Sequence, residues 1–381
     1  MDDILEFGAG VLIDGHAHPL VDEEAVGESE FAFSFSESDD GEILGRHMGT
    51  SVTLLAAVRH FARRLGVDPE PSALVEYRNR VGLKAYVRAL LGPEGVGCIL
   101  LDTGYPKNGL RLAKCEDVLG VCCKEVVRVE GIAESLLPRS RTADELIAGV
   151  GEALRQVDTG QVVALKTIAA YRCGLDLSAP TTGQIREAFD EERKRYESGG
   201  SVRLTRGPLI SAVVLAALEV AREMRLPLQI HTGFGDRDLD LRSANATLLR
   251  PIFASARYRD VRFVLLHANY PFVREAALLA ALYPNVYVDL SLAIPLTAHG
   301  GRRVVSALLE QAPYSKIMYG SDASVRPELF AWGAAVGKAA VASTLRELVG
   351  QGWLTREKAA DCARRILAGN AAEVYGIEVP R

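Results

Sequence analysis

Short apolar runs rich in β-branched residues recur along the chain, and helical or irregular stretches separate them. This alternation predicts successive strand–helix units. Eight runs qualify as strands: 10–14, 96–102, 121–130, 162–166, 227–231, 261–267, 286–290 and 316–320. Amphipathic helices are expected between several of them, at 209–225, 272–283, 302–311 and 342–348. Because strand, helix and strand in succession are typical of a parallel sheet, the pattern predicts an α/β fold.

The number and placement of these strands favour a closed barrel over an open sheet. Eight strands, the first of them almost at the N-terminus, match a (β/α)8 TIM barrel. The glycine pair Gly8 and Gly10 precedes a strand, whereas a nucleotide-binding loop follows one. The connections 19–95 and 167–226 are too long for plain turns, so we expect long insertions after strands 1 and 4. Residues 1–381 are expected to form a single barrel domain.

Composition narrows the class of partner. The chain has 49 acidic and 44 basic residues and a formal charge of −5, without a long block of one sign. We therefore expect a small-molecule substrate, and neither nucleic acid nor a membrane as partner. A homo-oligomer stays open. The charged stretches 34–42 and 190–195 are interpreted as solvated helix or loop faces.

Two further features concern the cell compartment. The first ten residues lack a basic segment, and no apolar run reaches about 18 residues, so a cytoplasmic protein is expected. Six cysteines are scattered without CxxC spacing, which predicts reduced thiols and no disulfide framework. They are Cys98, Cys115, Cys122, Cys123, Cys173 and Cys362.

Polar residues gather at the ends of the predicted strands, where a barrel enzyme carries its catalytic groups. His16 and His18 follow strand 1, His231 and His267 end strands 5 and 6, and Asp322 follows strand 8. Residues two apart in an extended chain point the same way, so His16 and His18 can face one ion. This set predicts a divalent metal site, with Zn²⁺ as the first choice and Mn²⁺ or Fe²⁺ as alternatives. The remaining histidines are not assigned to the site: His47, His60 and His299.

Lys166 ends strand 4 and would point toward the same end of the barrel. As an ammonium it would repel a metal, so it is chemically altered, points away, or serves an anionic substrate group. Together, HxH after strand 1, Lys after strand 4, His after strands 5 and 6 and Asp after strand 8 resemble the amidohydrolase superfamily. In that superfamily the strand 4 lysine is often carbamylated and bridges two metals.

Several segments are similar to one part of this superfamily, the amidohydrolase-2 branch, and particularly to the domain fused to glutamine synthetase-like modules in nodulin/FluG-type proteins. They are 13–18, 101–105, 128–130, 164–175 and 366–375. The resemblance implies that His16, His18 and Asp322 hold a first ion and that His231 and His267 hold a second. Carbamylated Lys166 would bridge the two ions. In a one-metal variant, His267 would instead contact the substrate or water.

The resemblance also implies a reaction. We expect hydrolysis of a C–N bond in an amide-like small molecule, with a γ-glutamyl or other acidic amide suggested by the fused relatives, and with Asp322 and His267 as catalytic residues. The main alternative is a metal-dependent non-oxidative decarboxylase. Relatives in this branch catalyse such a decarboxylation without the strand 4 lysine. Isomerisation of a sugar acid and a non-catalytic scaffold are weaker alternatives.

Other polar residues near the strand ends are candidates for substrate binding. Arg172 could bind a substrate carboxylate through its two-pronged guanidinium, or form a salt bridge within its loop. Tyr171, the residue before Arg172, is also assigned to substrate binding. Asp102, Arg128 and Glu130 could line the pocket or form a buried polar network. The loop after His231 is expected to be solvated at its three acidic residues: Asp236, Asp238 and Asp240.

Overall fold

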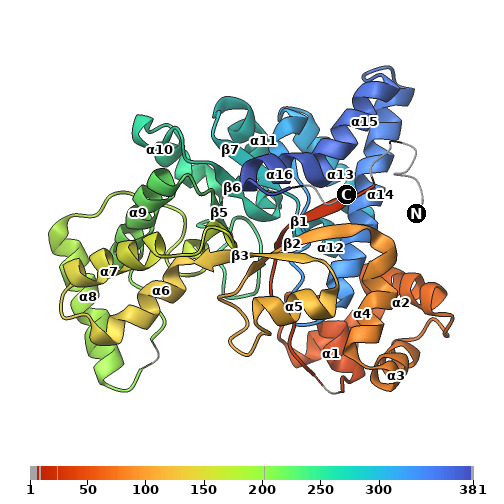
Figure 1. The fold of residues 1–381 in the computed structure, drawn as a ribbon, viewed down its shortest axis with the longest axis horizontal. Helices are drawn as coiled ribbons and strands as arrows, with labels where there is room; N and C mark the ends of the chain where they lie inside the picture. Colours follow the sequence, from red (N-terminus) through yellow and green to blue (C-terminus); the bar gives the residue numbers. More distant parts are fainter. Residues whose placement is uncertain (1–6, 8–9, 24, 201, 379–381) are drawn as a thin grey trace. The chain divides into compact units, whose positions relative to one another are not determined.

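The computed structural model describes residues 7, 10–23, 25–200 and 202–378 (Figure 1). Contacts between residues divide the chain into two compact units. Unit 1 comprises Met1–Lys124, Gly235–Arg237 and Asp289–Arg381, and unit 2 comprises Glu125–Phe234 and Asp238–Val288. The expectation of a single domain stays a prediction.

Eight strands form one sheet in which neighbours follow chain order from β1 to β8. They are β1 (Leu12–Ala17), β2 (Val96–Asp102), β3 (Cys122–Arg128), β4 (Val162–Thr167), β5 (Leu228–Ile230), β6 (Phe263–Leu265), β7 (Val286–Asp289) and β8 (Ile317–Met318). The strand pairs β1–β2, β3–β4, β4–β5, β5–β6 and β6–β7 are parallel. The fold is the (β/α)8 TIM barrel that the sequence predicts.

In unit 1, β1 also lies beside the segment that follows β8. The Gly15 N–H donates to the Tyr319 carbonyl at 3.0 Å, and the Asp322 N–H donates to the His16 carbonyl at 2.8 Å. Leu20 and Val325 form a further parallel bridge. These bonds join the first strand of the sheet to the segment that directly follows the last strand, as closure of a barrel requires.

The helices, like the strands, are distributed between the two units. Unit 1 contains α1 (Glu28–Phe33), α2 (Val52–Leu65), α3 (Pro71–Val81), α4 (Leu83–Leu91), α5 (Leu112–Leu119), α12 (Ala293–Thr297), α13 (Gly301–Leu309), α14 (Glu328–Gly350), α15 (Arg356–Arg364) and α16 (Asn370–Tyr375). Unit 2 contains α6 (Val129–Leu136), α7 (Ala143–Arg155), α8 (Thr182–Glu197), α9 (Gly207–Met224), α10 (Arg250–Phe253) and α11 (Val273–Leu282).

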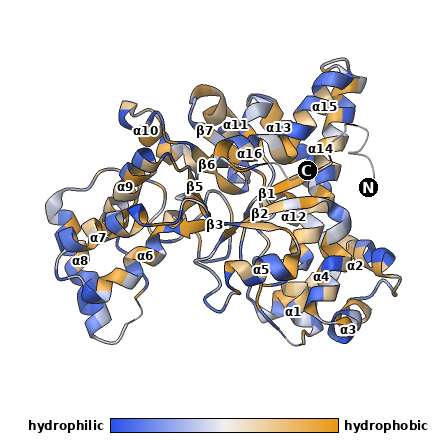
Figure 2. Cartoon of the chain, in the orientation of Figure 1, coloured by the Kyte–Doolittle hydropathy of each residue, from blue (hydrophilic) through white to orange (hydrophobic). Residues whose placement is uncertain are grey.

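Burial explains why these segments fold as they do. All residues of β1 and β4 are buried, as expected for parallel strands covered on both faces, and Figure 2 shows a hydrophobic stretch, in orange, in β1. Helices such as α7 are amphipathic, with Leu146, Val150 and Leu154 buried on one face. A capping box at the start of α8, between Thr181 and Gln184, satisfies the first free N–H groups of that helix.

The insertions after strands 1 and 4 are confirmed. The first contains α1 to α4 between β1 and β2, and the second contains α8 and α9 between β4 and β5. In the described residues, no helix combines the length and the apolar character needed to cross a membrane. All six cysteines are free.

Several boundaries differ from the sequence prediction, including those of β1, β3 and α14. Strand β1 continues to Ala17 and does not stop at Asp14, so His16 is itself a strand residue. Strand β3 ends at Arg128, and helix α6 begins at Val129, which places Glu130 on a helix. Helix α14 has 23 residues, far more than the predicted 342–348. The glycines in this helix lower its helix propensity, so the sequence pattern did not indicate its full length.

Candidate functional site

In unit 1, two imidazoles converge on one carboxylate oxygen. His16 Nε2 lies 3.1 Å and His18 Nε2 lies 3.3 Å from Asp322 Oδ1. His16 is fully buried, and only 13% of the Asp322 side chain is exposed. Ligand atoms bound tetrahedrally to a Zn²⁺ ion at about 2.0–2.1 Å are about 3.3 Å apart. The two nitrogens and the oxygen therefore fit a shared divalent ion.

The backbone places these three side chains. His16 is held in β1, and the His18 N–H donates to the Ala323 carbonyl at 2.7 Å. Asp322 has a left-handed backbone with φ of 56°, a conformation that costs energy for a residue other than glycine. The hydrogen bond from its N–H to the His16 carbonyl helps to fix this conformation. The positions of the three converging groups are therefore set by pairing between β1 and the segment after β8.

A buried carboxylate on β1 supports the same segment. Asp14 is 1% exposed and accepts hydrogen bonds from the N–H of Ser321 at 2.8 Å and from the Ser321 hydroxyl at 2.5 Å. The Ser321 hydroxyl in turn accepts from the Ala323 N–H at 3.0 Å. Burial raises the pKa of Asp14 to about 7, although the Ser321 bonds oppose this shift. Asp14 thus holds both neighbours of Asp322 in place.

A second buried carboxyl lies at the end of β7. Asp289 Oδ1 accepts from the N–H of Ser291 at 2.8 Å and from its hydroxyl. A Cβ at Gly320 would lie 2.4 Å from Asp289 Oδ2, and a Cβ at Gly15 would lie 3.2 Å from it. Glycine is therefore needed at position 320 for this carboxyl to fit. Burial raises the pKa of Asp289 to about 7, and the charges of Asp14 and Asp322 add to that rise.

His18 has a second set of contacts through its other ring nitrogen. Nδ1 lies 3.2 Å from the Asp102 carbonyl oxygen and 3.9 Å from its Oδ2. The Asp102 carboxylate also accepts from the Gly104 N–H at 2.9 Å. The Tyr105 ring packs edge-on against His18, with centroids 5.6 Å apart. A group that hydrogen-bonds the second ring nitrogen of a ligand histidine fixes the tautomer and the orientation of that ring. Asp102 can have this role for His18.

In unit 2, the other two predicted histidines lie together. His267 Nε2 is 2.9 Å from His231 Nδ1, and their ring centroids are 4.4 Å apart. Both residues are buried. The Tyr171 ring packs against His231, and the centroids of the two rings are 4.4 Å apart. These two nitrogens fit adjacent ligand positions on a second ion.

The segments that follow β5 and β6 are joined tightly. The Thr232 hydroxyl donates to the Leu266 carbonyl at 2.6 Å, and the Phe234 N–H donates to the Tyr270 carbonyl at 2.7 Å. A Cβ at Gly233 would meet the Tyr270 carbonyl oxygen at 2.3 Å. His267 itself has a left-handed φ of 64°. Glycine at position 233 thus allows the strained His267 segment to pass close to His231.

Lys166 is buried near the end of β4, in register with Arg128 on β3. The next residue, Thr167, donates its hydroxyl to Glu130 Oε1 at 2.5 Å, and the Ile168 N–H donates to the same oxygen at 3.0 Å. Burial raises the pKa of Glu130 above its usual value. Glu130 therefore belongs to a buried polar network that holds the end of β4, one of the two alternatives the sequence allows.

Arg172 follows a short 3-10 helix, η6 (Ala169–Tyr171), and forms an ion pair. Its Nη2 lies 3.1 Å from Glu134 Oε1, and only 9% of the arginine side chain is exposed. The salt bridge expected as an alternative to substrate binding is therefore present. It uses one nitrogen of the guanidinium.

Several other sequence predictions concern residues outside the site. Asp236, Asp238 and Asp240 are exposed, as expected of a solvated loop. His60 lies 3.6 Å from Glu94 Oε1 in unit 1. Two further histidines, His47 and His299, are exposed.

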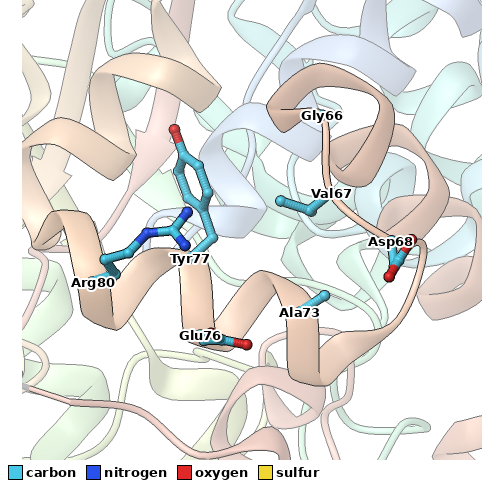
Figure 3. Close-up of a pocket in the computed structure, with 7 residues that line it drawn as sticks. All are labelled: Gly66, Val67, Asp68, Ala73, Glu76, Tyr77 and Arg80. Atoms are coloured by element: carbon cyan, nitrogen blue, oxygen red, sulfur yellow. The ribbon is translucent and has the colours of Figure 1, made fainter.

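A surface pocket of about 390 Å³ opens in unit 1, but none of the predicted site residues lines it (Figure 3). Arg80 packs against the Tyr77 ring at this pocket, with the guanidinium carbon 5.3 Å from the ring centroid. The pocket is lined by Gly66, Val67, Asp68, Ala73, Glu76, Tyr77 and Arg80.

Three residues that support the site were missed in the sequence. Asp289 ends β7, so the search for polar residues at strand ends could have found it. Asp14 stands in the same Asp-Gly-His-Ala-His segment as the histidines. Ser321 precedes Asp322, but nothing in the sequence indicates its pairing with Asp14, 307 residues earlier.

The fold and the site together define a class of protein. A family model described as amidohydrolase matches residues 150–377. The chain belongs to this amidohydrolase family, whose superfamily is metal-dependent. The predicted amidohydrolase-2 branch is thereby confirmed.

Individual relatives agree with this assignment. The chain is 27% identical to Protein fluG of Emericella nidulans, over 96% of this chain and 45% of that protein, so it spans about half the length of this relative. A crystal structure from Lactobacillus casei, described as a candidate metal-dependent hydrolase, superposes with a TM-score of 0.85 and 28% identity, covering 96% of this chain and 95% of the other.

More distant structures share the fold alone. Glucuronate isomerase from Caulobacter crescentus gives a TM-score of 0.67 at 13% identity, covering 100% of this chain and 94% of the other. Uronate isomerase from Thermotoga maritima gives 0.66 at 13% identity, covering 98% and 96%. The barrel is therefore shared by hydrolases and isomerases, and the reaction has to be argued from the site.

Proposed function

We propose that this protein hydrolyses a C–N bond of an amide-like small molecule in a metal-dependent reaction. One observation carries the proposal: two buried imidazoles, His16 and His18, lie 3.1 and 3.3 Å from one oxygen of Asp322. A buried set of two nitrogens and a carboxylate is typical of a catalytic metal site with an open position. The related structure described as a candidate metal-dependent hydrolase supports the same reaction class.

The donor set favours Zn²⁺, and Mn²⁺ or Fe²⁺ would also accept imidazole and carboxylate. We propose that His231 and His267 hold a second ion. Lys166, if carbamylated, would carry a carboxylate that bridges both ions. Burial of Lys166 supports this assignment, because an unmodified ammonium would be costly to bury beside a divalent cation.

The side chains supply the remaining chemistry. A bound divalent ion would lower the pKa of a water ligand and polarise the amide carbonyl. Asp322 accepts the proton of the attacking water and delivers it to the leaving nitrogen. Asp14 keeps the Asp322 segment in position through Ser321, and Asp102 keeps His18 in one orientation. In a one-metal enzyme, His267 would contact the substrate carbonyl.

The runner-up is non-oxidative decarboxylation on the same barrel. The buried lysine at the end of β4 favours hydrolysis, since the resemblance associates decarboxylation with its loss. The two reactions release different products. Ammonia or an amine indicates hydrolysis, whereas CO₂ from an unsaturated or aromatic acid indicates decarboxylation.

The deciding experiment combines metal analysis with a substrate panel. Metal-replete protein is expected to hold at least one tightly bound ion and to release ammonia or amine from some member of a panel of acidic and neutral amides. Asp322→Asn should lower kcat about 10²- to 10⁴-fold. Asp240→Asn, at an exposed aspartate, is the matched control and should leave kcat unchanged. Substoichiometric metal, or CO₂ release without amide turnover, would contradict the proposal.

Other properties are proposed on the sequence alone. With a net charge of −5 and no block of one sign, the substrate is a small molecule, and neither nucleic acid nor a membrane surface is a partner. The protein is cytoplasmic, and a homo-oligomer is compatible with these features. Sedimentation analysis measures the oligomeric state directly.

A further inference from the structure

Arg172 in unit 2 has a buried guanidinium that is only partly engaged. Its Nη2 pairs with Glu134, but Nε and Nη1 are also buried and have no hydrogen-bond partner among the described residues. Arginine presents five N–H donors in a planar fork, and a buried charged donor without an acceptor is costly. The fork therefore has capacity to bind a further acceptor.

The partner of Arg172 is itself held in place. Glu134 Oε1 accepts a hydrogen bond from the Leu204 N–H at 3.0 Å as well as the ion pair with Arg172. This carboxylate therefore anchors one edge of the guanidinium to the segment before α9.

The surroundings of Arg172 carry an excess of positive charge. Burial is the largest cause that lowers the pKa of Arg172, and the nearby charges of Arg203 and Arg128 lower it further. Glu134 and Glu130 act in the opposite direction. Burial, however, raises the pKa of Glu130, whose Oε1 is already bound by Thr167 and Ile168. Three arginines thus lie near two carboxylates that are both already hydrogen-bonded to other groups, and an added anion would be stabilised here.

The position of this cluster connects it with the candidate site of unit 2. Arg128 ends β3, in register with Lys166 on β4. Arg172 directly follows Tyr171, whose ring lies 4.4 Å from that of His231. Arg172 therefore lies one residue from a side chain that packs on the second pair of histidines.

We propose that Arg172, assisted by Arg128 and Arg203, binds a carboxylate of the substrate, so that the amide hydrolysed is an acidic one. This inference rests on the proposed function, and it names the substrate class of that site. The planar fork matches a carboxylate in a two-bond arrangement. Arg203 and Glu134 thereby join the site although the sequence did not indicate either.

Equilibrium binding to the metal-loaded protein tests the inference. The probes are glutaramate, which carries one amide and one carboxylate, and glutaramide, which carries two amides and no charge. Wild-type protein should bind glutaramate at least about 10-fold more tightly by calorimetry, because a site built for a polar group rejects the analogue that lacks it. Arg172→Gln should abolish this preference and leave glutaramide binding unchanged.

Matched variants keep the test clear of folding effects. The double variant Glu134→Gln with Arg172→Gln avoids leaving the partly buried Glu134 carboxylate without its ion-pair partner, and it should lose the same preference. Arg206→Gln changes an exposed arginine that pairs with Glu191 in the same region, and it should preserve the preference. Unchanged glutaramate binding in folded Arg172→Gln, or equal loss of both ligands, would overturn the inference. Tighter binding of inorganic phosphate than of glutaramate would overturn the carboxylate assignment.

The two proposals fail in different ways. Binding and product release are separate measurements, so an Arg172-dependent preference for glutaramate with no hydrolysis of any amide would overturn the proposed function alone. Hydrolysis of neutral and acidic amides with equal KM, together with no binding preference, would overturn the substrate class alone.

Discussion

Glu94 and the pair Asp14 and Asp289 are all buried carboxyls of unit 1, but they have different partners. Glu94 precedes β2 and forms ion pairs with Arg64 and with Lys338, whose Nζ lies 2.8 Å from Oε2. Burial raises its pKa, yet the neighbouring His60, Lys338 and Arg64 outweigh burial and lower the pKa to about 2. Glu94 is therefore ionised at every physiological pH.

Asp14 and Asp289 accept hydrogen bonds from neutral donors, mainly the N–H and hydroxyl groups of Ser321 and Ser291. Burial raises the pKa of each to about 7. A carboxyl held by cations stabilises the fold as a fixed charge, whereas the charge of a buried carboxyl held by neutral groups depends on whether a cation lies nearby. The difference separates a structural end of the strands from a functional end, as in other barrels.

Lys166 is a buried ionisable group of unit 2. Replacing it tests whether this group has a functional role, as proposed for Asp14 and Asp289, or a structural one, as proposed for Glu94. Lys166→Ala should lose metal and lower activity about 100-fold or more, because a bridging ligand would be gone. Short carboxylates such as formate or acetate should restore part of both if the lysine is carbamylated. Lys194→Ala, at an exposed lysine of α8, is the control. Full metal content and full activity in Lys166→Ala would remove the bridging role.

Glu94 should affect stability and leave the metal site unchanged. Glu94→Gln leaves Lys338 and Arg64 without their buried counter-charge and should cost about 3 kcal/mol of unfolding free energy at pH 7. Because the pKa of Glu94 is lowered from 4.5 to about 2, its stabilisation is complete above pH 4.5 and is lost as the pH falls through 2. Denaturant unfolding at several pH values should show the difference between variant and wild type shrinking over that window.

Metal affinity should be unchanged in Glu94→Gln, and a loss of metal there would break the comparison. Glu42→Gln serves as the control for stability, because Glu42 is an exposed glutamate whose ion pair with Arg46 is also exposed. Such a surface pair contributes little to stability.

Replacing Asp14, in contrast to Glu94, should change metal affinity. Asp14→Ala removes the acceptor for both donors of Ser321 and should weaken metal affinity 10- to 100-fold, roughly the effect of losing a group that orients a ligand. Asp14→Asn keeps one acceptor and should recover part of that affinity. Competition with a metal chelator measures both variants, and Asp117→Ala, at an exposed aspartate, is the control. Unchanged affinity in folded Asp14→Ala would show that Asp322 needs no such support.

The eight strands and the six proposed ligands could be predicted because they depend on local pattern. Apolar runs mark the strands, and a polar residue that ends such a run faces the active end of a barrel. The exact extent of β1 could not be predicted, since Gly15 and His16 are poor strand formers. They stay in the strand because of pairing with Tyr319 and Asp322, more than 300 residues away.

Long-range packing explains the other differences as well. Helix α14 runs through Gly333 and Gly337, which lower helix propensity, but a Cβ at Gly337 would lie 2.7 Å from the Tyr319 ring. The pairing of Arg172 with Glu134 likewise depends on where α6 and η6 lie in the folded chain. Such partners are set by tertiary structure, and one sequence contains no local sign of them.

Asp289 allows the smallest and most specific test of the comparison. Its pKa is raised from 3.8 to about 7, so the folded state holds the proton more tightly, and stability should fall as the pH rises through that window. In chelator-treated protein, Asp289→Asn should match wild type near pH 4 and be more stable by about 1–2 kcal/mol near pH 8. The gain is limited because the new amide hydrogens face Gly15 and Gly320, where Asp289 Oδ2 is closely packed. Thermal unfolding across pH measures it. Equal stability of the two proteins at pH 8 would show that Asp289 ionises at little cost, and the contrast with Glu94 would then not hold.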